Sequence, residues 1–279
     1  MFPDAMQMAV VKKDIYSVAS NGRMLAVLAT VTLAASIVIP AVFLLAVLLS
    51  PPDSPDLDRL AATLGSSSVV ATEDAAGCPD GAAGCGDPRA LVMGLILNGV
   101  LPLFFLMVPV TASSAMAAGA FIGEKEKNTL ETLVCSPLPL KRIFAAKIMA
   151  SFLVGAAASA LSLAVTVSAV PAAVFLATGV FVPPGANWLI VAFLVSPAVS
   201  LIAISLIVRG SAKARSFEES QQRASFLVLP IVAAAAAQFG GLFIMDARAF
   251  LAAGAGLAVL ALFVCRAAFA RFRLEALFG

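Results

Sequence analysis

Charged side chains gather in one passage in the middle of a chain that is otherwise almost free of them. The passage, GEKEKNTLETLVCSPLPLKR (Gly123–Arg142), lies between two long apolar stretches. Its carboxylates alternate with lysines, so it lacks the carboxylate pair or metal motif that a membrane-embedded enzyme would need. The chain also has no histidine, which removes the commonest nitrogen ligand of a metal site. The sequence therefore argues against an enzyme.

The elements around this passage are predicted to be membrane-spanning helices. Hydrophobic residues make up 61% of the chain and charged residues 12%, and the mean hydropathy is +1.03. Uncharged apolar runs longer than about 18 residues are typical of transmembrane helices. We therefore predict an all-α membrane protein, a single transmembrane domain over residues 1–279 with six spans. The predicted spans are 24–49, 91–122, 148–180, 188–208, 226–245 and 249–268, with an outer loop at 50–90 and a charged loop at 123–147.

The distribution of basic residues predicts the orientation. With six spans, fifteen of the 18 Lys and Arg residues fall on one face and only Arg59, Arg89 and Arg248 on the other. Loops rich in Lys and Arg stay in the cytoplasm. Both termini and the charged loop are thus expected there, in a multi-pass membrane protein. Because the basic residues are explained by topology, they do not indicate a nucleic-acid partner.

A short helix is predicted inside the charged loop. Asn128 followed three residues later by Glu131 fits a capping box, and Pro137 ends the helix. The helix would cover Thr129–Cys135. Its apolar side chains are spaced to share one face: Leu130, Leu133 and Val134. So short a helix is marginal in water unless docked, either on the bilayer or the protein's own inner ends, or in a pocket of a separate soluble protein.

The same passage resembles the signature of ABC-2 type transporter permeases. A second stretch, ARSFEESQQRASFLVLP (214–230), is similar to the lead-in to the fifth span in the sodium-export permease subset. In the first passage the matching positions are Glu124, Glu126, Thr129, Leu130, Glu131, Leu133, Ser136, Pro137, Leu138 and Lys147.

The resemblance implies an export permease of the prokaryotic cell (inner) membrane that works as a homo- or heterodimer among membrane lipids. Two cytoplasmic ABC ATPase subunits would bind ATP and Mg and would contact the signature residues, apart from Lys147, as a coupling helix between spans two and three. The chain itself has no Gly-x4-Gly-Lys-Ser/Thr phosphate loop and is expected to hold no cofactor. The alternatives are an ATPase-independent channel, a secondary carrier or a membrane scaffold.

Four smaller features complete the expectations. Ser216, Glu218 and Glu219 offer a second ATPase contact or a plain solvated face. Asn98 and Gln238 are polar residues within spans, which either bond across helices or line a substrate path. Prolines within or near the spans are expected to kink them: Pro40, Pro102, Pro109, Pro171, Pro197 and Pro230. Cys78 and Cys85 in the outer loop either form a disulfide or remain free thiols. No metal site is expected.

Overall fold

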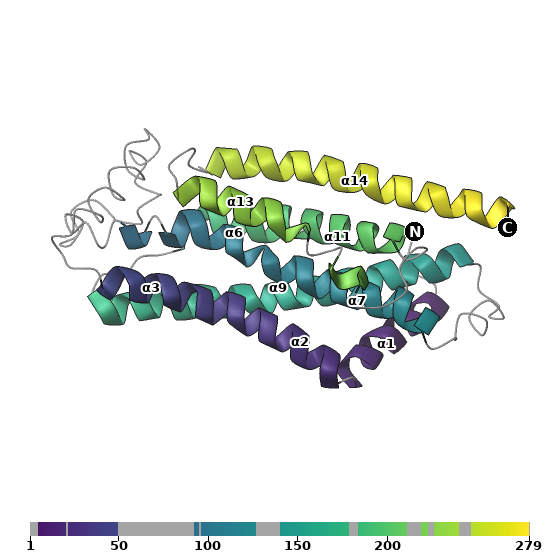
Figure 1. Ribbon diagram of the computed structural model, residues 1–279, viewed down its shortest axis with the longest axis horizontal. Coiled ribbons are helices and arrows are strands. Elements are labelled where there is room, and N and C mark those ends of the chain that lie inside the picture. Colours follow the sequence, from purple (N-terminus) through teal and green to yellow (C-terminus); the bar gives the residue numbers. More distant parts are fainter. Residues whose placement is uncertain are drawn as a thin grey trace.

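The protein is a bundle of helices that run side by side along its longest axis (Figure 1). The computed structural model describes residues 5–20, 22–49, 92–94, 96–126, 140–178, 184–210, 219–222, 226–239 and 247–278, and these contain no strand. The α-helices are α1 (Ala5–Ser20), α2 (Gly22–Leu33), α3 (Ile39–Leu49), α6 (Leu101–Phe105), α7 (Met107–Glu126), α9 (Leu140–Thr178), α10 (Ala186–Ile190), α11 (Ser196–Gly210), α13 (Val228–Phe239) and α14 (Ala247–Phe278).

Five helical stretches of the described residues are long and apolar enough to cross a membrane. They are Leu28–Leu49, Val92–Gly123, Arg142–Leu176, Ala186–Gly210 and Arg248–Ala268. The helical, multi-span class expected from the sequence is confirmed. The fifth predicted span, 226–245, corresponds to α13, which has 12 residues. At about 1.5 Å per residue, that helix is about 18 Å long, short of the roughly 30 Å hydrocarbon core. A sixth crossing stays a prediction.

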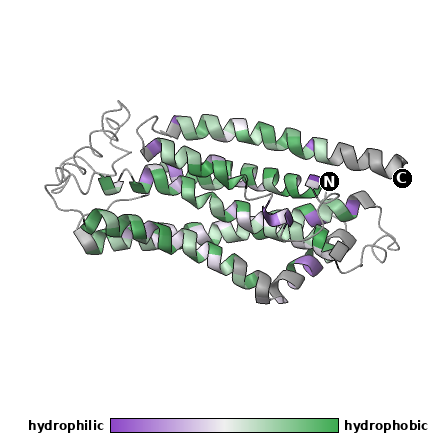
Figure 2. Ribbon diagram, viewed as in Figure 1, coloured by the Kyte–Doolittle hydropathy of each residue, from purple (hydrophilic) through white to green (hydrophobic). Residues whose placement is uncertain are grey.

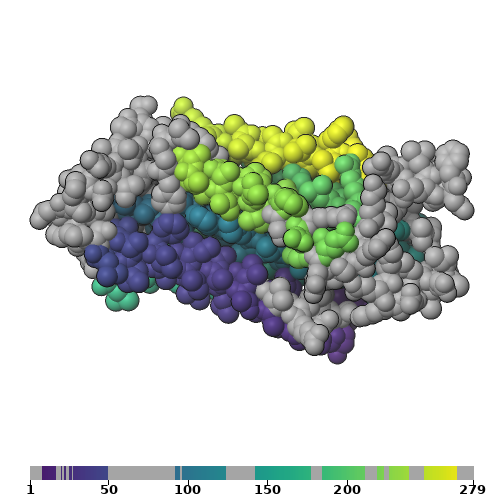
Figure 3. Space-filling view, in the orientation of Figure 1, coloured from purple at the N-terminus to yellow at the C-terminus, as the bar shows by residue number. Residues whose placement is uncertain are grey.

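The bundle is organised around α7 and the helices that precede it. The stretch Val92–Gly123 is mostly buried, whereas the stretches in α14 and in α2 and α3 are mostly exposed. The exposed faces of these outer helices carry large apolar side chains such as Leu45 and Phe263. Figure 2 shows hydrophobic colour over much of α14 and α3, and Figure 3 shows α13 and α14 on one side of the central helix and α2 and α3 on the other. An apolar exterior of this kind is suited to lipid.

Within the described residues, three short π-helices interrupt the spans, and each ends two residues before a proline. A proline has no N–H and its ring crowds the carbonyl of the preceding turn, so a widened turn relieves the clash. In two of them the bond that closes the wide turn is resolved, from Ile39 N–H to the Ala34 oxygen and from Ser196 N–H to the Val191 oxygen. The π-helices and their prolines are η1 (Ala34–Val38) with Pro40, η2 (Ile96–Val100) with Pro102, and η3 (Val191–Val195) with Pro197.

The other prolines disturb the helices less. Pro109 and Pro230 lie in the first turns of α7 and α13, where a missing N–H costs little. Pro171 lies inside α9, which continues past it to Thr178. The helix breaks are therefore concentrated at Pro40, Pro102 and Pro197.

Several helix ends that carry basic residues lie together at one end of the bundle. In Figure 1, α1, the C-terminal ends of α7 and α14 and the N-terminal end of α9 all lie at the right-hand end. Arg209 also lies near this end, where its guanidinium donates to the Val264 carbonyl oxygen (3.1 Å) and ties α11 to α14. The candidate functional site lies at this end.

Candidate functional site at the ends of α7 and α9

The helices on either side of the charged segment extend further than the sequence predicts. The structure continues α7 to Glu126 and begins α9 at Leu140, whereas the charged loop was expected to run from 123 to 147. Glu124 and Glu126 therefore belong to the last turn of α7. The remaining predicted coupling residues lie outside the described part of the chain: Thr129, Leu130, Glu131, Leu133, Ser136, Pro137 and Leu138. Their role stays a prediction.

The lysine at the end of the signature is buried between these two helices. Lys147 of α9 is only 3% exposed. Its Nζ donates a hydrogen bond to the carbonyl oxygen of Ala120 in α7 (2.6 Å) and lies 5.8 Å from the centre of the Phe121 ring. Phe121 in turn stacks on Phe144 of α9, with 5.3 Å between ring centroids. Lys147 thus joins the two helices that carry the charged segment.

Sequence reasoning placed Lys147 in the loop because spans were delimited by charges. The residues one helical turn away on each side could have shown that Lys147 lies inside a helix. Ile143 and Ala150, one turn before and one turn after, are both buried apolar residues on the same face. A lysine on such a face points into the bundle.

The second predicted contact is only partly described. Ser216 and Glu218 lie outside the described residues, and Glu219 begins a short helix at 219–222. Ser220 of that helix is buried, and the Gln221 side-chain amide donates to the Ser114 hydroxyl of α7 (3.2 Å). The segment therefore packs against α7 as well.

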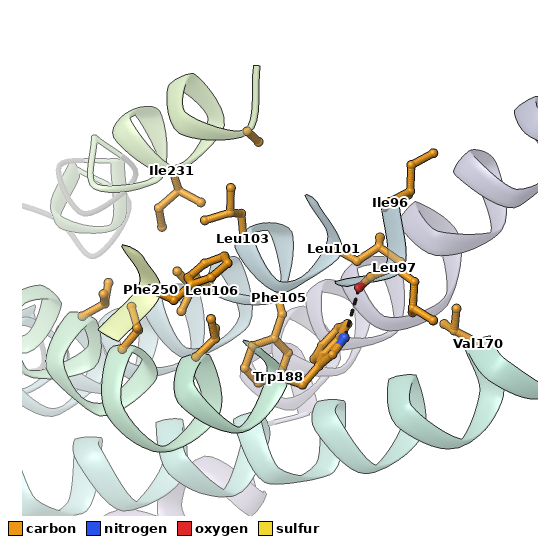
Figure 4. Close-up of a cluster of buried hydrophobic side chains, with 14 of the residues drawn as sticks. Ile96, Leu97, Leu101, Leu103, Phe105, Leu106, Val170, Trp188, Ile231 and Phe250 are labelled. Atoms are coloured by element: carbon orange, nitrogen blue, oxygen red, sulfur yellow. Dashed lines mark hydrogen bonds between the residues drawn. The ribbon is translucent and has the colours of Figure 1, made fainter. Parts of the chain in front are cut away.

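Asn98 lies in a junction between helices. Its side-chain oxygen accepts a hydrogen bond from Gly185 N–H (2.6 Å), and its backbone oxygen accepts one from the Asn187 side chain (2.9 Å). The Trp188 indole N–H next to it donates to the Leu97 oxygen (3.1 Å), within the apolar cluster of Figure 4. This supports the expectation of bonding across helices, while the substrate-path role stays a prediction.

Gln238 is buried in a different way. Its side chain packs against Gly99, where an added Cβ would fall 2.8 Å from the Gln238 amide nitrogen. Its side-chain oxygen is buried and has no hydrogen-bond partner among the described residues. Such a group is costly to bury, which makes Gln238 a candidate for contact with something else.

Cysteines and acidic residues add no further site to the described part of the chain. Cys78 and Cys85 lie outside it, and Cys265 is a half-buried free thiol in α14. Within the described ranges no group of three or more His, Cys, Asp or Glu side chains is placed to hold a metal.

Together, the apolar spans and the buried polar junctions define a multi-pass helical membrane protein. A family model described as ABC-2 family transporter protein matches residues 8–264. The chain therefore belongs to the ABC-2 transporter family, whose members are membrane permease components, generally not catalytic, that typically work with an ABC ATPase. No curated protein and no solved structure matched the chain. The likeness to the sodium-export subset stays a prediction.

Proposed function

We propose that this chain is the permease subunit of an ATP-driven ABC-2 exporter, which couples a separate cytoplasmic ATPase to efflux of a substrate. The observation that carries the proposal is the family match over residues 8–264. The charged signature segment connects α7 to α9 in the sequence, and the end of α7 and the start of α9 lie at one end of the bundle with α1 and the end of α14. A partner at this end would reach four elements of the permease at once.

The ATPase contact is proposed to be the segment between α7 and α9. Its contacts would include Glu124 and Glu126 in the last turn of α7 and Leu133 in the predicted short helix. The other proposed contacts are Thr129, Leu130, Glu131, Ser136, Pro137 and Leu138. Glu219, with Ser216 and Glu218, forms a second contact. The bond from Gln221 to Ser114 supports this, because it fastens that segment to the same helix that leads into the first contact. ATP and Mg would be bound by the partner.

The orientation follows from the positive-inside rule. The charged end would face the cytoplasm of a prokaryotic cell, and residues 50–90 would face outward. Two permease chains would then form the transporter, either as copies or as related subunits.

The substrate path is proposed to involve Gln238 more than Asn98. The oxygen of Gln238 has no partner among the described residues, whereas that of Asn98 accepts a short bond from Gly185. A group without a partner is available to a passing molecule at little cost.

Co-expression with the ABC ATPase of a neighbouring reading frame tests the proposal. The two proteins should co-purify, and the complex should hydrolyse ATP in liposomes at a rate that differs from that of the ATPase alone. The purified chain by itself should hydrolyse none. Efflux that continues without an ATPase would instead indicate a channel or a secondary carrier.

A further inference from the structure

The buried lysine at the α7–α9 junction has no role in the function proposed above. Lysine is almost never fully buried unless it is paired, because removing an ammonium group from water is costly. Lys147 is 3% exposed and lies over the ring of Phe121, which belongs to a buried apolar cluster. A helix junction that only needed packing would be served at lower cost by leucine or methionine. The ammonium group therefore calls for a specific explanation.

The position of the bond along the two helices suggests one. Ala120 lies six residues before the end of α7 at Glu126, and Lys147 lies seven residues after the start of α9 at Leu140. At about 1.5 Å per residue, the bond lies about 10 Å from the end of α7 and about 10 Å from the start of α9. The bond therefore closes the hairpin whose tip is the charged segment.

The chemistry of the bond distinguishes it from ordinary packing. The acceptor is a backbone carbonyl inside a helix, so the bond fixes the position of the helix itself rather than that of a mobile side chain. A charged donor makes such a bond stronger than a neutral one. The Phe121 ring lies near the ammonium, and its stacking on Phe144 brings a second pair of α7 and α9 residues together at the same level.

We propose that Lys147 is a positioning residue that fastens α7 to α9, so that a push on the charged segment moves both helices as one body. This inference rests on the proposed function, because it assumes that an ATPase moves residues 127–139. Without the bond, the same push would bend or slide one helix along the other, and the outer half of the bundle would not follow. Lys147 touches neither ATP nor substrate in this account.

A distance measurement across the bundle tests the proposal without knowledge of the substrate. Two exposed residues near the opposite end, Leu176 of α9 and Leu251 of α14, are replaced by Cys in a background whose four native cysteines are Ser. Nitroxide labels at these sites report their separation by pulsed electron paramagnetic resonance. The complex with the ATPase in nanodiscs is compared without nucleotide and after trapping with ATP, Mg and vanadate.

The nucleotide-dependent shift in this distance is expected in the wild type and is expected to be lost in Lys147→Met. Lys147→Arg should restore the shift, because a guanidinium also donates to a carbonyl. Phe144→Leu serves as the matched control, since it loosens the same interface without removing the bond. That variant should unfold at a lower temperature and still shift. A purely structural lysine would instead give the same behaviour in Lys147→Met and Phe144→Leu.

A wild-type shift in a folded Lys147→Met complex would overturn the proposal. Should Lys147→Met fail to fold, Lys147→Gln replaces it. The glutamine side chain is shorter than that of lysine, so its amide does not reach the Ala120 carbonyl oxygen. Loss of the shift is therefore expected in Lys147→Gln, and a wild-type shift would again overturn the proposal. Failure of the wild type to bind the ATPase, or to shift with nucleotide, would refute the proposed function itself and is seen before any variant is compared.

Discussion

Gly155 of α9 lies directly against Ser113 of α7, with no room for a side chain between them. A Cβ built on Gly155 would overlap the Ser113 hydroxyl oxygen and would fall 3.1 Å from the Ser113 Cβ. Ser113 is completely buried, and its hydroxyl has no hydrogen-bond partner in the described part of the chain. Small residues at such a crossing let two membrane helices approach closely. The central helix and α9 therefore approach each other closely at this crossing, on the side of the Lys147 bond that is away from the charged segment.

The first prediction concerns this crossing. Gly155→Ala should destabilise the protein by about 1–3 kcal/mol, the usual range for an overpacked core site. Gly256→Ala in α14 is the control, because no atom lies within 4 Å of its added Cβ. Thermal unfolding in detergent measures both. Adding Ser113→Ala to Gly155→Ala should recover part of the loss, since the overlapping oxygen is removed. No recovery in the double variant would contradict the close approach.

The second prediction concerns the junction at Asn98. Asn98→Ala should cost about 1–3 kcal/mol, because it leaves the Gly185 N–H without its acceptor. Asn187→Ala removes a different bond at the same junction and should cost less, about 0.5–1.5 kcal/mol. Thermal unfolding of the two variants in parallel gives the comparison. Equal stability of Asn98→Ala and the wild type would refute a structural role and favour a place in the substrate path.

The third prediction concerns Gln238 and a substitution that is not expected to lower stability. Gln238→Met keeps the length of the side chain and removes a buried oxygen that has no partner in the described residues. We expect unchanged or higher stability, because an unsatisfied buried polar group costs about 1–3 kcal/mol. The same unfolding assay measures it. A clear loss of stability would mean that the Gln238 amide makes bonds that the proposal leaves out.

The fourth prediction tests the orientation. In intact cells a membrane-impermeant maleimide should label Cys78 and Cys85, either at once or only after an external reductant opens a disulfide. Cys135 should be labelled only in opened membranes. Single-cysteine variants separate the three signals. Labelling of Cys135 in intact cells would reverse the topology.

The helical membrane class could be predicted from composition. A long uncharged run such as 148–180 must pair its backbone N–H and C=O groups internally in lipid, and at this length a helix does so. The limits of the sequence are visible at particular residues. Lys147 was assigned to the loop, since a rule that ends spans at charges does not see a partner such as the Ala120 carbonyl. That partner depends on how α7 crosses α9, which is a property of the tertiary fold.

The effect of the prolines and the partner of Asn98 also depend on the tertiary fold, so local sequence patterns could not predict them. Pro40, Pro102 and Pro197 marked disturbed helices correctly, but a proline alone does not say whether the helix kinks or widens into a π-turn. Asn98 was recognised as polar and intramembrane, yet its partner Gly185 is 87 residues away in the chain. The predicted helix at Thr129–Cys135 lies outside the described residues, so only an experiment on the complex can test it.

The central claim is that this segment binds an ATPase, and the binding affinity of two neighbouring variants tests it most directly. In the predicted helix Leu133 lies on the apolar face and Thr132 on the opposite one. Leu133→Asp should weaken binding of the purified permease to its ATPase by at least about tenfold, or about 1.4 kcal/mol, because the carboxylate would enter an apolar pocket. Thr132→Asp should bind as the wild type does. An unchanged dissociation constant for Leu133→Asp, in a permease that remains folded, would contradict the account.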